Sequence, residues 1–172
     1  HLTNIVTTFD TNLGWTVRFD IQGGTNGLLY DIFATTDLGG NSITNSPWTW
    51  LERGPTCTTY QYTNQPGATA FYAVGLTNDT DGDLLSDAFE RLVSRSDPAQ
   101  PDTDGDGLPD GWEWEHFGGF SETASGDYDG DGISNGQEYL NGTEPNTIHF
   151  TAHFGYGHFS SVTITGSLEV LG

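Results

Sequence analysis

The chain contains no lysine, no methionine and only one cysteine among its 172 residues. Cys57 therefore has no internal disulfide partner, and we expect it to be a small buried hydrophobe. A start at His1 without methionine favours a processed chain or a fragment. No apolar run approaches the roughly 20 residues that a membrane-spanning helix needs, so no membrane insertion is expected.

Basic charge is almost absent as well. Four arginines stand against 24 acidic residues, which gives a formal net charge of −20. Such a surface repels nucleic acid and anionic membranes, which bind through Lys and Arg, and it attracts cations. A merely solubilising acidic surface is the alternative. It does not explain why 18 of the 24 acids lie between Asp79 and Glu144 and recur at fixed spacing.

The sequence also lacks the common catalytic motifs. It has no Gly-x-Ser-x-Gly, no phosphate-binding Walker loop and no His-Glu-x-x-His. A carboxylate pair for glycoside hydrolysis stays open among so many acids, although these acids are spaced for metal binding. The expectation is a protein that is not an enzyme, with no catalytic residue.

The ends of the chain have the period of two that is typical of β-strands. Val17, Phe19 and Ile21 alternate with polar residues, and Phe150, Ala152 and Phe154 do so near the C-terminus. Frequent Gly and Asn turns separate these segments. The predicted fold class is mainly β: an antiparallel β-sandwich plus an irregular calcium-loop region with three short helices.

Three segments are predicted along the chain. Residues 1–76 form a β-sandwich module, residues 77–146 carry three calcium-binding loop-helix repeats, and residues 147–172 form C-terminal strands. We expect these last strands to rejoin the sheet or to pair with a neighbouring subunit. Gly118, Gly119 and Gly142 are predicted to end the second and third helices.

The repeats themselves align without gaps over twelve positions. Asp or Asn stands at positions 1, 3, 5 and 9, Glu at position 12, and Gly at position 4, while position 6 is Gly in two loops and Leu84 in the first. The three loops are Asp79–Glu90, Asp102–Glu113 and Asp127–Glu138. Leu84 is a departure, because position 6 often needs a positive φ, and we expect the first loop to bind more weakly or to wrap differently.

This spacing matches calcium, which takes six to eight oxygen ligands at about 2.3–2.6 Å. Alternate aspartates point inward when the chain curls, the carbonyl at position 7 adds an oxygen, and the final Glu binds through both oxygens. About three ions or more are expected. The predicted metal ligands are Asp79, Asp81, Asp83, Leu85, Asp87 and Glu90 in the first loop; Asp102, Asp104, Asp106, Leu108, Asp110 and Glu113 in the second; and Asp127, Asp129, Asp131, Ile133, Asn135 and Glu138 in the third.

Two simpler interpretations explain part of this pattern. Asp87, Asp110 and Asn135 can be helix N-caps with the position-12 Glu completing a capping box, a role compatible with metal binding. Capping does not account for the Asp-x-Asp-Gly-Asp that precedes it. A disordered acidic linker is the other interpretation, but aromatic residues such as Trp112 and Trp114 give the segment apolar anchors.

The loops, with Leu or Ile at position 7 and with Ser-Asp-Pro (96–98) or Thr-Glu-Pro (143–145) after the helix, resemble bacterial thrombospondin type 3 repeats. The segments 30–36 and 48–51 look like the small all-β modules that precede such repeats in bacterial surface proteins. The resemblance implies a secreted, extracellular protein of a bacterial cell surface or appendage. It also implies calcium-stiffened spacing or adhesion without catalysis.

The expected function is thus an extracellular calcium-binding structural protein, a building block of a bacterial surface, matrix or fibre assembly. Its partners would be other copies of itself or other surface proteins. The alternative is a carbohydrate-binding adhesion module, in which Trp48, Trp50, Tyr60, Tyr62 and Tyr72 form a platform for glycans. His149 and His153 are expected to be solvated strand positions rather than metal ligands.

Overall fold

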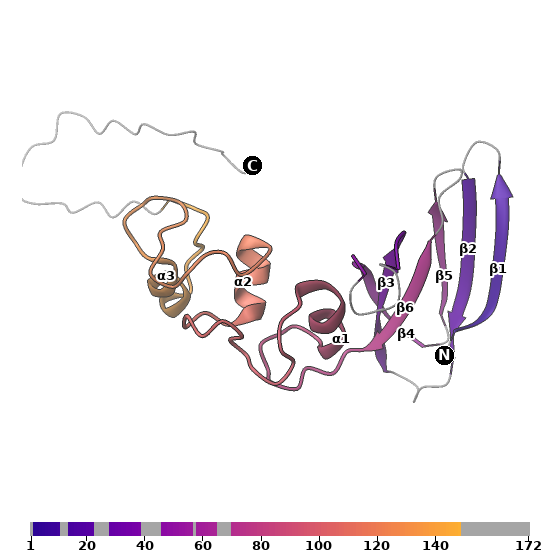
Figure 1. Ribbon diagram of the computed structural model, residues 1–172, viewed down its shortest axis with the longest axis horizontal. Coiled ribbons are helices and arrows are strands. Elements are labelled where there is room, and N and C mark those ends of the chain that lie inside the picture. Colours follow the sequence, from indigo (N-terminus) through magenta and orange to yellow (C-terminus); the bar gives the residue numbers. More distant parts are fainter. Residues whose placement is uncertain are drawn as a thin grey trace, which may run out of the picture.

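The computed structural model describes residues 2–10, 14–22, 28–38, 46–56, 58–64 and 70–148. Within them the chain forms six strands followed by three short helical segments (Figure 1). The strands are β1 (Leu2–Asp10), β2 (Gly14–Ile21), β3 (Leu29–Thr35), β4 (Thr49–Pro55), β5 (Thr59–Asn64) and β6 (Phe71–Leu76). The helices are α1 (Asp87–Phe89), which continues as the π-helical turn η2 (Glu90–Ser94), α2 (Asp110–Phe117) and α3 (Asn135–Asn141). The predicted class, mainly β with antiparallel sheets and three short helices, is confirmed.

The strands form two antiparallel three-stranded sheets. The strand orders are β1-β2-β5 and β4-β3-β6. The alternation in β2 predicts which face is buried, and Phe19 and Ile21 are indeed 1% and 0% exposed. They pack with Ile32 of β3 and Tyr60 of β5, so residues from both sheets share one core.

The tyrosines of the proposed glycan platform belong to this core. Tyr60 is buried, and the rings of Tyr62 and Tyr72 stack on each other at 5.4 Å between centroids and both contact Phe19. Trp48 is 7% exposed. Of the five aromatic residues suggested for sugar binding, only Trp50 presents a substantial surface, 41% of its area. The packing interpretation therefore accounts for the other four.

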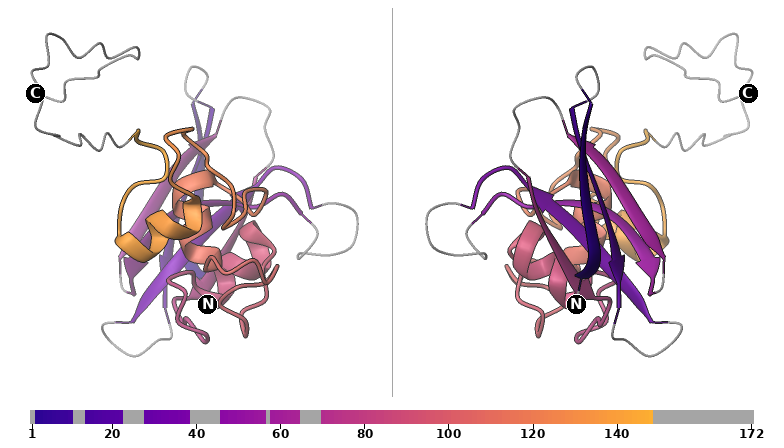
Figure 2. Two further views of the ribbon diagram at one scale, coloured as in Figure 1. Left: turned by 90° about the vertical axis from the view of Figure 1, so that its left-hand side faces the viewer. Right: turned by 90° about the vertical axis from the view of Figure 1, so that its right-hand side faces the viewer.

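The first repeat packs against the opposite face of the second sheet. A Cβ on Gly75 of β6 would lie 2.2 Å from the Cβ of Ala88 in α1 and 3.6 Å from the ring of Phe33. Only a residue without a side chain allows α1 to come this close. The repeats then follow one another away from the sheets, and Figure 2 views the same arrangement from its two ends.

A buried carboxylate joins the two parts. Asp31 of β3 is fully buried and accepts two hydrogen bonds from Arg53, at 2.8 and 3.0 Å, and one from the Trp50 indole at 2.9 Å. It also accepts the hydroxyl of Ser86, in the first calcium loop, at 2.6 Å. Ser86 in turn is the N-cap of α1 and accepts the N–H of Phe89. The carboxylate therefore connects two strands of the sheet with the first loop.

Helix ends agree only partly with the sequence-based expectation. The N-caps are Ser86, Pro109 and Ser134, one residue before the predicted Asp87, Asp110 and Asn135. The predicted stops at Gly118 and Gly142 are confirmed, and both glycines have left-handed φ, at 73° and 66°. The shift of the caps frees the position-9 side chains for another role, described below.

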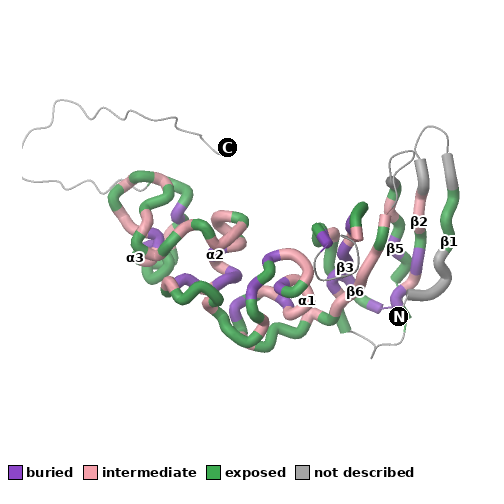
Figure 3. Tube along the Cα trace, in the orientation of Figure 1, coloured by how far each residue is buried: buried purple, intermediate pink, exposed green. Residues whose placement is uncertain are grey.

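Burial in the repeats is confined to short stretches between exposed loops (Figure 3). Aromatic contacts bridge consecutive repeats: Phe89 meets Trp114 at 5.5 Å, and Trp112 meets Tyr139 at 5.5 Å between ring centroids. The predicted C-terminal strands, with His149 and His153, lie outside the described residues. Among the residues that are described, no helix has the length and apolar character to span a membrane.

The Asp31 contacts predict a pH-dependent stability. Burial alone would raise the pKa of Asp31, but the hydrogen bonds from Arg53, Ser86 and Trp50 outweigh it and hold the pKa below its usual value. A depressed folded-state pKa means that this stabilisation is present above the unfolded pKa, about 3.9, and is lost as pH falls through the folded value. We expect Asp31→Asn to lower the free energy of unfolding at pH 7 by about 1.5–3 kcal/mol, measured by urea denaturation.

The difference between wild type and Asp31→Asn should shrink as the pH falls below about 4. Asp20→Asn is the matched control, because Asp20 lies on the other sheet and accepts an exposed hydrogen bond from Thr59. Its effect should stay within about 0.5 kcal/mol. A difference for Asp31→Asn that stays constant down to pH 2 would contradict the assignment.

Candidate metal centre

The residue at position 9 closes each acidic loop at its neck, the point where the chain enters and leaves the loop. The backbone N–H of this residue donates to the carbonyl oxygen just before the loop: Asp87 to Asn78 at 2.7 Å, Asp110 to Pro101 at 2.9 Å and Asn135 to Gly126 at 2.8 Å. Its side chain accepts the backbone N–H of position 2, which is Thr80 at 3.0 Å, Thr103 at 2.9 Å or Tyr128 at 3.0 Å. Position 9 therefore fixes the loop entrance.

Position 1 makes the chain curl. Its carboxylate accepts the N–H groups of positions 4 and 6, for example those of Gly105 and Gly107 on Asp102 at 2.7 and 2.9 Å. The same pair of bonds occurs at Asp79 and at Asp127. This curl needs positive φ at both positions, which glycine adopts without steric cost.

Leu84 adopts the same backbone as the glycines at position 6 of the other loops. Its φ is 85°, against 101° for Gly107 and 91° for Gly132. The prediction that the first loop might wrap differently is therefore wrong, since its hydrogen bonds repeat those of the others. The Leu84 side chain is 81% exposed, so burial does not offset the strain. Weaker binding by this loop stays a prediction.

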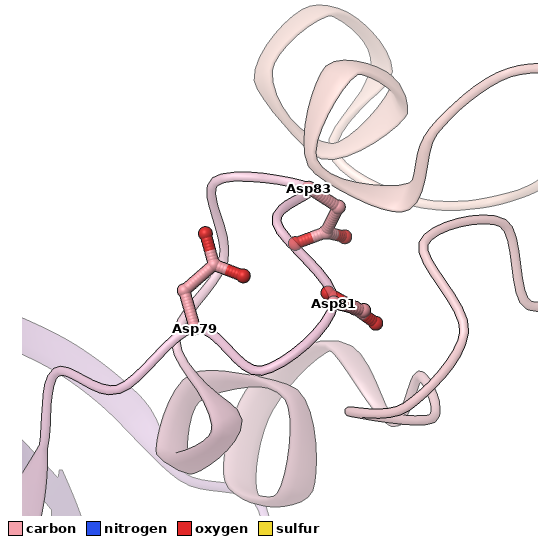
Figure 4. A group of neighbouring side chains, drawn as sticks. All are labelled: Asp79, Asp81 and Asp83. Carbon is pink, nitrogen blue, oxygen red and sulfur yellow. The ribbon is translucent and has the colours of Figure 1, made fainter.

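The aspartates of positions 1, 3 and 5 converge in every loop. In each trio, one carboxylate oxygen per residue lies within 4.8 Å of the others. The trios are Asp79, Asp81 and Asp83; Asp102, Asp104 and Asp106; and Asp127, Asp129 and Asp131. Figure 4 shows the first trio projecting from a single curl of the chain. Three carboxylates at such separations repel one another strongly without a counter-charge.

The position-12 glutamates are fully buried acids. Glu90, Glu113 and Glu138 are all 0% exposed. Both carboxylate oxygens of Glu113 lack a hydrogen-bond partner in the described structure, as does Oε2 of Glu90. Burial, followed by the charges of Asp104, Asp106 and other acids of its loop, raises the pKa of Glu113 to about 8.

Glu90 has a similar environment. Burial raises its pKa to about 7, against the opposing hydrogen bond from Ser96, and the charges of Asp81 and other loop acids add to the rise. A buried, unpartnered carboxylate next to three others is costly unless a cation neutralises it. The donor set consists of oxygens only, which suits calcium rather than zinc or copper.

The residues thus fit calcium. The trio aspartates and the buried Glu of each loop would hold the ion, whose charge would cancel their repulsion and connect the loop to the helix.

The remaining predicted ligands are the residues at positions 7 and 9. Leu85, Leu108 and Ile133 stand two residues after the last aspartate of each trio, and their N–H groups donate to that aspartate at 2.8 Å. Their carbonyl oxygens as ligands stay a prediction, and the position-9 side chains occupy the loop necks.

Position 10 is a structural position that the sequence reasoning missed. A Cβ on Gly111 would lie 1.9 Å from the carbonyl oxygen of Asp83, and one on Gly136 would lie 2.9 Å from that of Ala124. Ala88, at the same position in the first loop, packs on Gly75. The sequence does carry a signal for this contact, because position 10 is Gly or Ala in all three repeats. This small residue marks where each repeat packs on the preceding segment.

The site is a loop-helix repeat whose converging carboxylates suit a calcium ion. Residues 102–118 and 127–147 match the family model described as bacterial TSP3 repeat, so the predicted resemblance is confirmed for these segments. The first loop lies outside the match, although its hydrogen bonds are the same. Comparisons with curated proteins and with solved structures gave no significant match.

The strain at Leu84 predicts the effect of its replacement. Leu84→Gly should increase the calcium-bound stability by up to about 1 kcal/mol, because a left-handed L-residue costs about 1–2 kcal/mol and the greater freedom of unfolded glycine returns part of this. Thermal melting in calcium checks it. The matched variant Gly107→Leu should lower stability, because φ there is 101°. A Cβ at Gly107 would meet nothing within 4 Å, so the loss would come from backbone strain and not from a steric clash. Equal shifts of one sign in both variants would contradict the strain argument.

Proposed function

We propose that this protein is an extracellular calcium-binding structural protein that contributes to a bacterial surface, matrix or fibre assembly. The observation that carries calcium binding is Glu113, a fully buried carboxylate without a hydrogen-bond donor, beside three converging aspartates. The match to bacterial TSP3 repeats supports the extracellular setting. The protein is proposed not to be an enzyme.

Calcium would act here as the equivalent of a hydrophobic core. Between residues 77 and 148, Leu108 is a buried hydrophobic side chain, whereas the position-12 glutamates, Asp83 and Asp110 are buried charged groups. Binding free energy then becomes folding free energy. Extracellular calcium modules typically bind at about 10⁻⁴–10⁻³ M, so the repeats would be rigid outside the cell and loose in a calcium-poor compartment.

The edge strands of the two sheets are the proposed sites of assembly with neighbouring molecules. In the described residues β1 and β5 are the edges of one sheet and β4 and β6 of the other. An unpaired edge offers N–H and C=O groups to a neighbouring strand. Copies of this chain, or other surface proteins, are the proposed partners.

Glycan binding is less well supported by the arrangement of aromatic residues. It would depend on Trp50, whose indole N–H is already donated to Asp31. A polysaccharide pull-down that is lost on Trp50→Ala would favour this alternative.

The decisive measurement for calcium is a melting curve with calcium and with a chelator. At a calcium concentration of about 100 Kd, each site should contribute about 2.7 kcal/mol. Glu113→Gln should reduce the calcium-dependent gain and at the same time stabilise the metal-free protein, because a neutral side chain removes the buried charge. Glu115→Gln, on the exposed side of the same helix, is the matched control and should change neither value. An identical midpoint with and without calcium would overturn the proposal.

Assembly predicts concentration-dependent association in calcium. Sedimentation velocity should show species larger than the monomer, and Val6→Lys should reduce them, because a charge on edge strand β1 blocks strand pairing. Val6 is 42% exposed, so its calcium-dependent melting should stay unchanged. Monomers alone across the concentration range, with calcium present, would rule out self-assembly as the role.

A further inference from the structure

The outer face of the first sheet carries polar side chains that neither the core nor the calcium loops use. Phe19 of β2 is 1% exposed and lies in the core. Because side chains alternate along a strand, Arg18 points to the opposite face. The strand register places Val6 of β1 and Gln61 of β5 directly opposite Arg18. A row of three side chains therefore crosses the sheet, with Arg18 in the middle.

A second row of side chains lies beside the first. Thr8 of β1 stands opposite Thr16 of β2, and Thr16 stands opposite Thr63 of β5, with 3.2 Å between the last two hydroxyl oxygens. Residues of both rows surround a cavity of about 180 Å³. Its lining residues are Val6, Thr8, Thr16, Arg18 and Gln61. Hydroxyl, amide and guanidinium groups thus surround a space of the size of a single sugar ring.

Arg18 is the basic residue of this cavity, and its side chain is exposed. In the part of the chain that the structure describes, Arg53 and Arg91 form ion pairs with aspartates, and Arg18 forms none. The other charged residue of β2 is Asp20, whose carboxylate accepts the Thr59 hydroxyl at 2.7 Å. The Arg18 guanidinium therefore presents a planar set of N–H donors to an external carboxylate.

The net charge of −20 does not act evenly on this cavity. Of the 24 acids, 18 lie between Asp79 and Glu144, and the second sheet stands between these repeats and the cavity (Figure 1). Packed sheets are about 10 Å apart, which is about one Debye length at physiological salt, so the charge of the repeats is largely screened there. Residues 1–76 contain five acids and two arginines. An anionic ligand is therefore compatible with this end of the molecule.

We propose that the cavity binds a carboxylated sugar, the uronate unit of an acidic polysaccharide. Arg18 holds the carboxylate through two parallel N–H groups, which gives planar, bidentate recognition. Thr8, Thr16 and Gln61 exchange hydrogen bonds with the hydroxyl groups of the sugar, and Val6 contacts its C–H face. An acidic side chain of another protein molecule fills only part of the cavity and leaves the hydroxyl and amide groups without partners. The sugar uses all of them.

This site is separate from the calcium loops and from Trp50, which belongs to β4 of the other sheet. A single exposed contact between arginine and a carboxylate contributes little free energy, so the Kd for one sugar should be about millimolar. A polysaccharide carries many uronates and can occupy several copies of this chain at once. Binding at a surface or matrix then gains strength from multivalency rather than from any one cavity.

The test is an NMR titration of the isotope-labelled full chain with galacturonate and with glucuronate, at a constant excess of calcium. Galactose and glucose are the matched neutral ligands, because each carries a hydroxymethyl group in place of the carboxylate. The amide signals of Val6, Arg18 and Gln61 should shift with at least one uronate, and the neutral sugars should bind about fivefold more weakly or less. Unchanged signals from Asp102–Glu113 show that the sugar does not act by withdrawing calcium.

Arg18→Gln should weaken uronate binding by about fivefold or more, and Arg18→Lys should weaken it less, because lysine keeps the charge without the planar donor set. Arg91→Gln is the matched control. It removes the same charge from a side chain that is 58% exposed in the repeats, and it should leave uronate binding unchanged. Since Arg18 is exposed, the melting midpoint of its variants should equal that of the wild type.

The comparison of sugars uses the wild type, so it holds even if a variant fails to fold. Absence of shifts with both uronates overturns the proposal, and so do equal shifts with neutral and carboxylated sugars. If no sugar binds but Arg18→Gln abolishes self-association in sedimentation velocity, the ligand is an acidic side chain of another copy, and the proposal is also overturned. Calcium-dependent melting does not depend on this cavity, so the proposed function is tested separately.

Discussion

Electrostatic repulsion between carboxylates is the constraint on which the repeat region depends. Three aspartates in each loop bring their oxygens within 4.8 Å, and a fully buried glutamate stands beside each trio. Backbone N–H groups satisfy part of this charge, since positions 4, 6 and 7 donate to the aspartates of positions 1 and 5. They are neutral dipoles and do not cancel four formal charges. A divalent cation would cancel them, and its binding would turn the least stable feature of each loop into a source of stability.

This constraint extends to the β-sheets through one contact. The Ser86 hydroxyl lies between positions 7 and 9 of the first loop and donates to Asp31, which Arg53 and Trp50 hold in the second sheet. Position 10 of the same loop, Ala88, packs on Gly75 of β6. An ion that orders the first loop therefore also orders the groups that bond and pack against the sheet. The first repeat is thus hydrogen-bonded to the β-module and packed against it across the predicted boundary near residue 76.

The sequence predicts the features that repeat and misses those that occur once. The loops, the convergence of their aspartates and the glycine stops at 118 and 142 follow from spacing, because each appears two or three times in register. The contact between Asp31 and Ser86 joins residues 55 positions apart, and nothing local to either residue indicates it. Leucine at position 6 predicts a change of backbone, yet Leu84 donates to Asp79 with the same positive φ as the glycines, so the difference lies in backbone strain and not in the path of the loop. The aromatic residues of the strands were ambiguous between surface and core, since period alone does not say which face another sheet covers.

The differences between the junctions suggest how stiffness is distributed along the chain. At the sheets, the first repeat is held by a buried ionic network; at the next junction, Asp83 receives an N–H from the second repeat and shares a cluster with Asp110. At the third repeat, Asn135 replaces the acid, and the connection consists of the Asp106 bond to Ala124 and the contact of Trp112 with Tyr139. Charge coupling thus weakens with distance from the sheets, whereas an aromatic contact is present at both junctions between repeats.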